Sequence, residues 1–113
     1  MDGRFVILVH DYPSLHWDFL LETGDAAATW RLSDCPASGR IIDAERIEDH
    51  RLLYLNYEGP VSGGRGRVSR VFSGRWAGQL GENQGRIDLA QCDAFTSASL
   101  SDGGDGALTW TFS

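Results

Sequence analysis

The amino-acid sequence predicts an all-β protein, built as one compact antiparallel β-barrel domain over residues 1–113. Three observations support this fold class. Short apolar, β-branched and aromatic segments follow one another along the chain. Turn residues separate them about every 8–12 residues, which is the spacing of a barrel or a closed sandwich. Hydrophobic residues make up 42% of the chain, enough for one core, and no repeat or linker divides it.

The first third of the chain predicts three strands. Residues 4–9 are apolar and β-branched, and turn residues at 11–14 end this strand. Residues 16–22 alternate between two faces, as a half-buried strand does. The apolar face carries Trp17, Phe19 and Leu21, and the other face carries His16, Asp18, Leu20 and Glu22. A third strand over 28–32 continues the meander.

The remainder of the chain adds further short strands. Residues 40–48 are ambiguous, because their isoleucines favour a strand whereas the sequence at 43–46 suits a helical turn. Strands are expected over 52–57, 67–72, 75–80, 85–89, 95–101 and 107–112. The glycine-rich stretch 58–64 is expected to be a loop. Glycines 63, 64 and 66 form no phosphate-binding motif, because neither a helix pattern nor G-K-[ST] follows them.

Charge and composition exclude several classes of protein. The net charge of −6 is the opposite of the basic footprint of a general duplex-binding protein, so any nucleic-acid contact is expected to be local or metal-assisted. No apolar run approaches the ~20 residues of a membrane helix, and the N-terminus does not resemble a signal peptide. We therefore expect a cytoplasmic monomer without membrane contact. Cys35 and Cys92 are expected to be two separate buried thiols.

A candidate metal site involves the histidines, all three of which lie beside acidic residues. In a strand His16 and Asp18 project from the same face, where an imidazole and a carboxylate can share a divalent cation. The third ligand is His10, at the end of the preceding strand, or His50. The alternative for each histidine is an ordinary hydrogen-bonded side chain, and for Tyr54 a core aromatic. The H-x-D pattern also occurs in non-haem iron oxygenases, which generally need a larger barrel than this chain supplies.

The segment His10–Glu22, HDYPSLHWDFLLE, resembles the signature H-D-x-x-x-L-H-[YW]-D-F-R-L-E of the 3′-phosphoesterase domain of bacterial DNA ligase D. That family works in non-homologous end joining and includes stand-alone members. A second block, Glu48–Gly59, is similar to its V-E-D-H-P-L-x-Y-x-x-F-E-G. Residues 64–68 and 74–76 match its G-x-G-x-V and G-x-W, so the resemblance covers most of the chain.

The resemblance implies an activity and its residues. The activity is the removal of a 3′-phosphate or a 3′-ribonucleotide from DNA or RNA-tipped DNA ends, with a DNA ligase or another end-joining protein as a partner. The implied metal is Mn²⁺, with Zn²⁺ or another divalent ion as the alternative. The implied metal ligands are His10, His16 and Asp18, and the implied catalytic residues are His50 and Tyr54.

The chain departs from the family pattern at three positions, the first of which is expected to bind the scissile phosphate. Leu20 replaces an arginine, Leu8 a glutamine and Asp34 a lysine. Leu20 follows Asp18 on the same strand face, so its side chain is expected to point toward the phosphate. The candidates to replace the lost charge are Arg65 and Arg67, and also Arg31. We expect reduced activity, and the alternative function is a metal-binding barrel that serves as a binding or assembly module of a repair complex.

Overall fold

The computed structural model describes all residues from 1 to 113 and shows nine strands and one short helix. These elements are β1 (Asp2–His10), β2 (His16–Glu22), β3 (Ala27–Leu32), β4 (Ile41–His50), η1 (Leu52–Leu55), β5 (Gly59–Pro60), β6 (Arg67–Leu80), β7 (Gly85–Ala90), β8 (Ser97–Asp102) and β9 (Leu108–Phe112). The chain has no helix of the length and apolar character that crossing a membrane would require.

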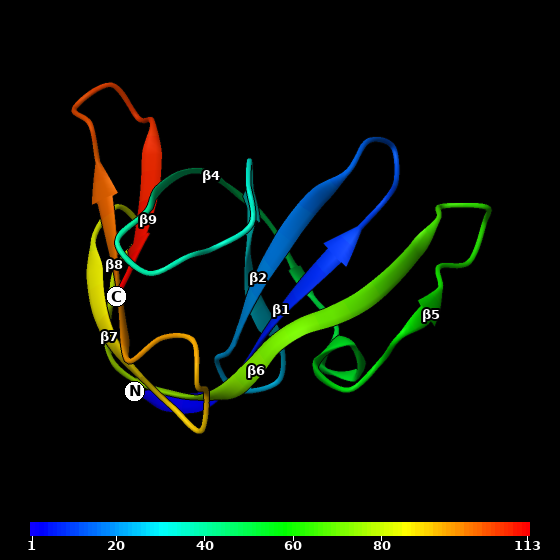
Figure 1. Cartoon of the computed structure of the whole chain (residues 1–113), viewed down its shortest axis with the longest axis horizontal. Coiled ribbons are helices and arrows are strands. Elements are labelled where there is room, and N and C mark those ends of the chain that lie inside the picture. Colours follow the sequence, from blue (N-terminus) through cyan, green and yellow to red (C-terminus); the bar gives the residue numbers. More distant parts are fainter.

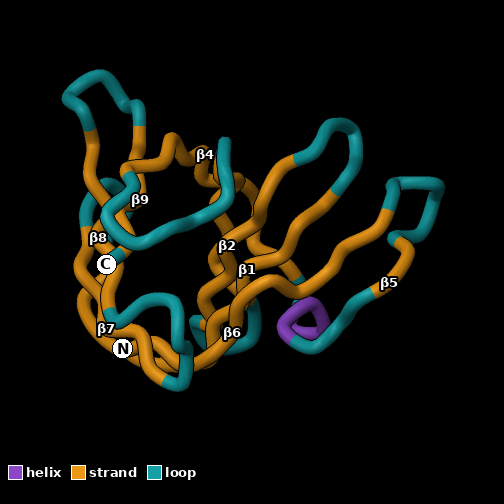
Figure 2. The backbone as a smooth tube through the Cα atoms, in the orientation of Figure 1, coloured by secondary structure: helices purple, strands orange, loops and turns teal.

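Eight of the strands form a closed antiparallel barrel, which confirms the predicted fold class. The order around the barrel is β1-β2-β3-β4-β9-β8-β7-β6, and β6 pairs with β1 to close it. The short strand β5 pairs only with the start of β6 and extends to one side of the barrel, next to η1 (Figures 1 and 2). Strand β1 therefore lies between β2 and β6 and is hydrogen-bonded on both edges.

The barrel interior is an aromatic core to which all eight strands contribute. Phe19 of β2 packs edge-to-face on Trp110, with ring centroids 5.0 Å apart, and Trp30 packs on the same indole at 5.2 Å. Such pairs add about 0.5–1.5 kcal/mol each beyond the area they bury. The alternation of β2 predicts this arrangement correctly, since Phe19 and Leu21 are fully buried in the core and Trp17 packs against it.

A second, smaller apolar cluster lies on the outer face of the barrel wall. Its six residues are Val6, Leu8, Leu20, Ala27, Leu55 and Val68. The helix η1 packs over β1 and β2 and contributes Leu55, so this part of the outer wall is covered by residues 51–61 rather than by water. The outer faces of β1 and β2 thus have a packed base on which polar side chains can be held in fixed positions.

Three sequence-based element predictions need correction or resolution. The strand expected at 52–57 is wrong, because β4 ends at His50 and a 3₁₀ helix follows. The strands expected at 67–72 and 75–80 are one continuous strand. Gly74 makes no turn there: a Cβ at this position would lie 2.2 Å from the carbonyl oxygen of Ala90, so glycine allows close packing of β6. The ambiguous stretch 40–48 belongs to β4.

Both cysteines are free and half-buried.

A candidate metal centre beside a polar cavity

Strand register brings His10, His16 and Asp18 together on the outer face of the barrel wall. His10 ends β1 and pairs directly with His16, the first residue of β2. Asp18 lies two residues further along β2, on the same face. One ligand atom from each residue lies within 4.8 Å of the others, so the group could hold a metal ion. His16 and Asp18 are buried, and His10 is half-buried.

Backbone carbonyls fix which ring nitrogen of each histidine carries the proton. The contacts are His10 Nε2 to the Arg65 oxygen at 2.8 Å, His16 Nδ1 to the Ser14 oxygen at 2.9 Å and His50 Nδ1 to the Glu48 oxygen at 3.2 Å. A carbonyl oxygen only accepts hydrogen bonds, so each of these nitrogens is the donor. In the neutral ring the second nitrogen is then an acceptor with an unshared lone pair.

All three of these second nitrogens face the carboxylate of Asp18. His16 Nε2 lies 3.3 Å from Oδ1, and His10 Nδ1 and His50 Nε2 lie 3.8 and 3.9 Å from Oδ2. A carboxylate also only accepts, and His16 Nε2 and Asp18 Oδ1 are buried without any hydrogen-bond partner. Lone pairs that converge while the opposite N–H groups are held by the backbone are typical of metal-ligating histidines. The donor set therefore fits a divalent cation of the kind bound by imidazole and carboxylate.

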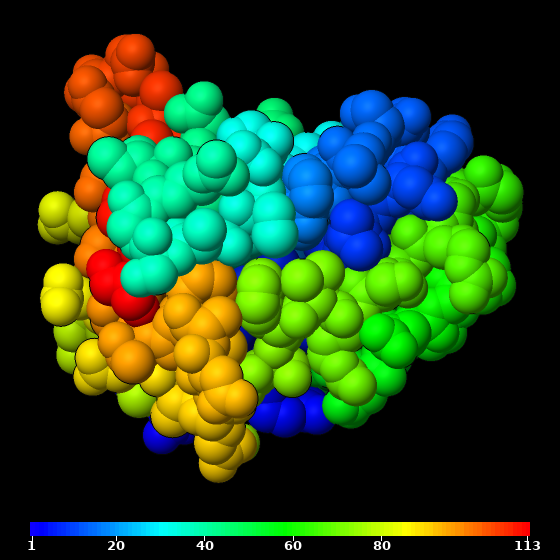
Figure 3. All heavy atoms as spheres, in the orientation of Figure 1, coloured from blue at the N-terminus to red at the C-terminus, as the bar shows by residue number.

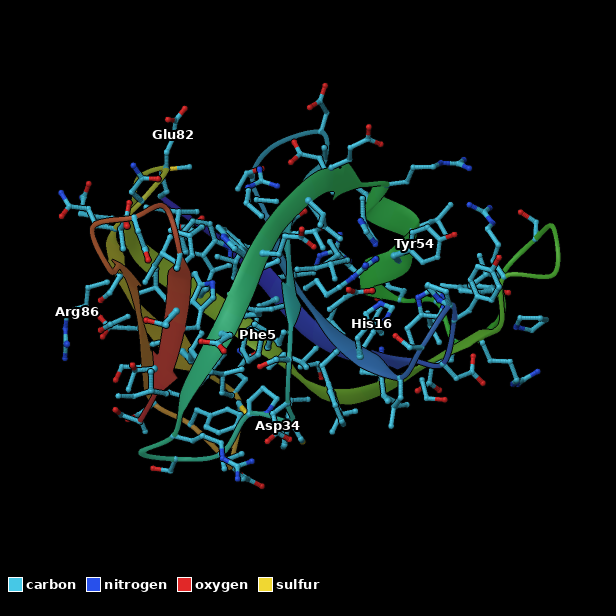
Figure 4. The ribbon with its side chains drawn as sticks, turned by 90° about the horizontal axis from the view of Figure 1, so that it is seen from above. Phe5, His16, Asp34, Tyr54, Glu82 and Arg86 are labelled. Atoms are coloured by element: carbon cyan, nitrogen blue, oxygen red, sulfur yellow. The ribbon has the colours of Figure 1, made fainter.

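His50 and Tyr54 lie beside this group at the edge of a cavity of about 400 Å³. His50 is the last residue of β4 and pairs with Ala27 of β3. Tyr54 is on η1, and its ring packs edge-to-face on His50 with centroids 5.6 Å apart. In Figure 4 Tyr54 and His16 lie on the same side of the molecule. The strand expected at 52–57 does not exist, and the turn of η1 brings Tyr54 against His50.

Of the three arginines expected to replace the lost charge, Arg65 lines the cavity, and Arg67 and Arg31 do not. Arg65 lines the cavity together with His10 and Asp18, and Ser62 fixes its guanidinium by accepting hydrogen bonds at the backbone oxygen (2.7 Å) and at Oγ (3.2 Å). Arg67 is exposed and is not among the cavity-lining residues; its backbone N–H donates to Asp11 Oδ1 at 2.8 Å. Sequence analysis missed Arg51, which also lines the cavity and could have been found from its position directly after His50.

The turn that carries Arg65 is attached to the β1–β2 hairpin. Gly66 has φ +75°, and a Cβ there would lie 2.2 Å from Asp11 Oδ1 and 2.7 Å from Tyr12 Cβ. Only glycine allows this approach. Figure 3 shows the blue hairpin tip and the green segment around residue 65 side by side at one end of the molecule. The contact holds the Arg65 carbonyl against His10, so the turn helps to orient a candidate ligand.

The three departures from the family pattern occupy different environments. Leu20 is fully buried in the outer apolar cluster and does not line the cavity. Leu8 is also buried and forms an apolar part of the cavity lining. Asp34 is exposed, outside the lining of the cavity, and pairs with Arg40 at 2.9 Å. The apolar wall under Asp18 therefore leaves Arg65 and Arg51 as the cations of this cavity.

Cavity size alone would not locate this site. The largest cavity, of about 600 Å³, is lined by residues from β6, β7 and β8 and their turns, and it contains no titratable side chain. The cavity at His10 and Asp18 is smaller, yet it holds the converging acceptors, two arginines and a tyrosine. Chemistry that needs a cation, a proton donor and an anion-binding group can therefore occur at the His10–Asp18 cavity and not at the largest one.

Comparison with known proteins gives one result. The family model described as the DNA Ligase D 3′-phosphoesterase domain matches residues 9–100 of the 113-residue chain. A search of the curated proteins finds no significant match. The matched region contains every residue of the metal group and of the cavity beside it except Leu8.

Proposed function

Because the chain belongs to the DNA ligase D 3′-phosphoesterase domain family, we propose that it removes a 3′-phosphate or a 3′-ribonucleotide from DNA ends with the help of a divalent cation, Mn²⁺. The observation that carries the proposal is the convergence of unshared acceptor atoms from His10, His16 and Asp18 beside a cavity that also holds His50 and Arg65. The proposed partners are DNA or RNA-tipped DNA 3′ ends and a DNA ligase that seals the product.

His10, His16 and Asp18 are the residues that would hold the cation. Its chemistry, when bound, is to polarise a non-bridging oxygen of the phosphate and to offset the charge that develops there. The protein keeps these ligands in one geometry, because the Ser14 and Arg65 carbonyls fix both imidazole rings from behind. Little reorganisation is then needed when the substrate arrives.

His50 is proposed as the proton donor. Its Nδ1–H is committed to the Glu48 carbonyl, so its Nε2 is the atom directed at Asp18 and the cavity. A proton on Nε2 can be donated to the leaving oxygen or to the phosphate in the transition state. Asp18 Oδ2 lies 3.9 Å from this Nε2, so the same carboxylate lies beside both the metal group and the proposed proton donor.

Tyr54 and Arg65 are proposed to position the phosphate. The edge-to-face contact with His50 fixes the Tyr54 ring at the cavity, where its hydroxyl can act as a hydrogen-bond donor. The two contacts with Ser62 hold the guanidinium of Arg65, whose planar N–H groups suit a phosphate. Arg67, placed away from the cavity, is the weaker candidate for this role.

A second candidate function follows from the burial of Leu20. The wall beneath Asp18 is apolar, as Leu8 and Leu20 pack together there, so this wall offers a phosphate no hydrogen bond. A barrel that binds a metal ion and a DNA end but does not hydrolyse the end would act as a binding module in a repair complex. In the assay below this function appears as Mn²⁺ binding by the parent without product.

The test is release of phosphate and of a ribonucleoside from labelled primers that carry a 3′-phosphate or a 3′-ribonucleotide, with and without Mn²⁺. We expect metal-dependent product from the parent, and loss of Mn²⁺ binding in His16→Ala. His50→Ala is expected to bind Mn²⁺ normally but to turn over about 10²–10⁴-fold more slowly. The matched control is Arg86→Ala, on β7 at the opposite side of the barrel (Figure 4). Product formation by His16→Ala at the parental rate would refute the proposal.

A further inference from the structure

Another cavity, called the second cavity below, lies beside His16, on the side away from the His10–Asp18 cavity, which is the first. Its volume is about 360 Å³, and it is lined by residues from the β1–β2 hairpin, β3 and β4, among them Ser14, Leu15, His16, Arg31 and Ser33. His16 connects this cavity to the first one, because its Nε2 lies 3.3 Å from Asp18 Oδ1, and Asp18 lines the first cavity. The candidate metal centre therefore has a cavity on each side.

Arg31 is the one cation in the lining of the second cavity, and its environment is unusual. In the sheet register Arg31 is opposite Asp18 on one neighbouring strand and opposite Glu45 on the other. An arginine between two carboxylates normally pairs with one of them, yet none of the ion pairs of the chain includes Arg31. Its Nε is buried without a hydrogen-bond partner.

An unsatisfied buried N–H on a guanidinium has a free-energy cost that a bound anion would remove. The rest of the lining fits a nucleotide better than a free anion. Leu15 is 61% exposed and offers an apolar surface to a sugar or a base, and Ser14 and Ser33 offer hydroxyl groups. Asp43 and Glu45 also line the cavity, where exposed carboxylates can accept from base or ribose N–H and O–H groups.

We propose that this second cavity binds the nucleotide next to the reacting 3′ end, with Arg31 on its phosphate. The inference rests on the proposed function, since it places the reacting phosphate at His10 and Asp18 and the neighbouring one beyond His16. It adds a binding subsite to that function: the strand is held at two successive phosphates, the second of them by Arg31. Recognition is confined to a few groups at the end of the strand, which is compatible with the net charge of −6.

A binding experiment tests the contact without turnover. The probe is a fluorescent single-stranded oligonucleotide with a 3′-phosphate, titrated with the protein in chelator at several salt concentrations. Arg31→Ala is expected to weaken binding about tenfold and to lower the slope of log K against log[salt] by about 0.7, the value for one phosphate contact on a single strand. Arg31→Lys should restore the slope, and Arg86→Ala should match the parent. A parental slope in Arg31→Ala overturns the proposal, even if its affinity is lower.

A kinetic experiment separates the two phosphates. Arg31→Ala is expected to raise KM about tenfold for the 3′-phosphorylated oligonucleotide and to leave KM for thymidine 3′-monophosphate unchanged, because the mononucleotide has no second phosphate. An equal rise for both substrates would assign Arg31 to the reacting phosphate and overturn the proposal. If the parent hydrolyses neither substrate, the proposed function fails, and the salt slope still decides the role of Arg31.

Discussion

Replacing Asp18 by asparagine should make the metal-free protein more stable while removing its response to metal. In the parent the carboxylate faces three ring nitrogens at 3.3, 3.8 and 3.9 Å, and the nearest of them, His16 Nε2, has no hydrogen-bond partner. Asparagine has the same shape but carries an NH₂ group, which can donate to His16 Nε2, the nearest of these nitrogens. The substitution therefore supplies a hydrogen bond where two buried acceptors now have none.

The magnitude follows from those two acceptors. A buried polar atom without a partner costs about 1–3 kcal/mol, so Asp18→Asn should raise the free energy of unfolding in chelator by a similar amount. The parent should gain about 2.7 kcal/mol from Mn²⁺ at a hundredfold excess over Kd, and the variant almost nothing, because a neutral amide replaces the charged ligand. Adding metal is thus expected to shift the stability difference between the two proteins by about 2.7 kcal/mol in favour of the parent.

Urea unfolding at pH 8, above the ordinary range of histidine titration, measures both quantities. Each protein is unfolded in chelator and in excess Mn²⁺, and Asp88→Asn, an exposed change on β7, serves as the control. A variant that is less stable than the parent in chelator would show that the acceptors are satisfied in some other way. A variant that keeps the parental metal stabilisation would show that Asp18 is not a ligand.

Three further predictions concern the surroundings of the site. Gly66→Ala should lower the free energy of unfolding by about 1–2 kcal/mol, because of its positive φ and the contact with Asp11, and should weaken Mn²⁺ binding about 10–100-fold in a calorimetric titration. Leu20→Arg should destabilise the fold by about 3 kcal/mol or more in urea, since it buries an unpaired charge; a stable variant with faster turnover would contradict the packing described above. Hydrogen bonds from Arg4 lower the pKa of Glu22, so its stabilisation is present above the unfolded-state pKa and is lost as the pH falls through the lower folded-state pKa. Glu22→Gln should therefore cost about 1 kcal/mol at pH 7 and nothing in strong acid, and an equal deficit at both pH values would rule out this linkage.

The alternation of residues 16–22 was sufficient to predict half of the candidate site. It placed His16 and Asp18 on one face and the aromatic core residues on the other, which is how β2 lies in the barrel wall. The choice between His10 and His50 as the third ligand needed the register. His10 pairs directly with His16, whereas His50 reaches Asp18 from β4 at 3.9 Å. Both histidines face the same carboxylate, but only His10 belongs to the group that could hold a metal ion.

Local pattern failed where tertiary packing decides the conformation. The apolar residues at 52–55 have strand propensity, but they form a 3₁₀ turn because Leu55 packs into the outer cluster on β1 and β2. Glycine is frequent in turns, but Gly74 lies within a strand, where it allows Phe5 and the Ala90 carbonyl to approach β6 closely. Neither outcome can be read from a window of neighbouring residues, since the partners lie far away in the chain.

The two faces of the β1–β2 hairpin pack in separate clusters, one in the barrel core and one on the outer wall, so the two faces can change independently in evolution. Even-numbered residues such as Leu8 and Leu20 pack in the outer cluster, and odd-numbered ones such as Ile7 and Phe19 pack in the barrel core. Substitutions that exchange ligands or phosphate-binding groups on the outer face can therefore accumulate without altering the contacts that hold the barrel closed. An engineer could exchange polar positions of this wall such as His16 and Asp18 on an unchanged barrel, whereas Leu8 and Leu20 are packed and would have to stay apolar.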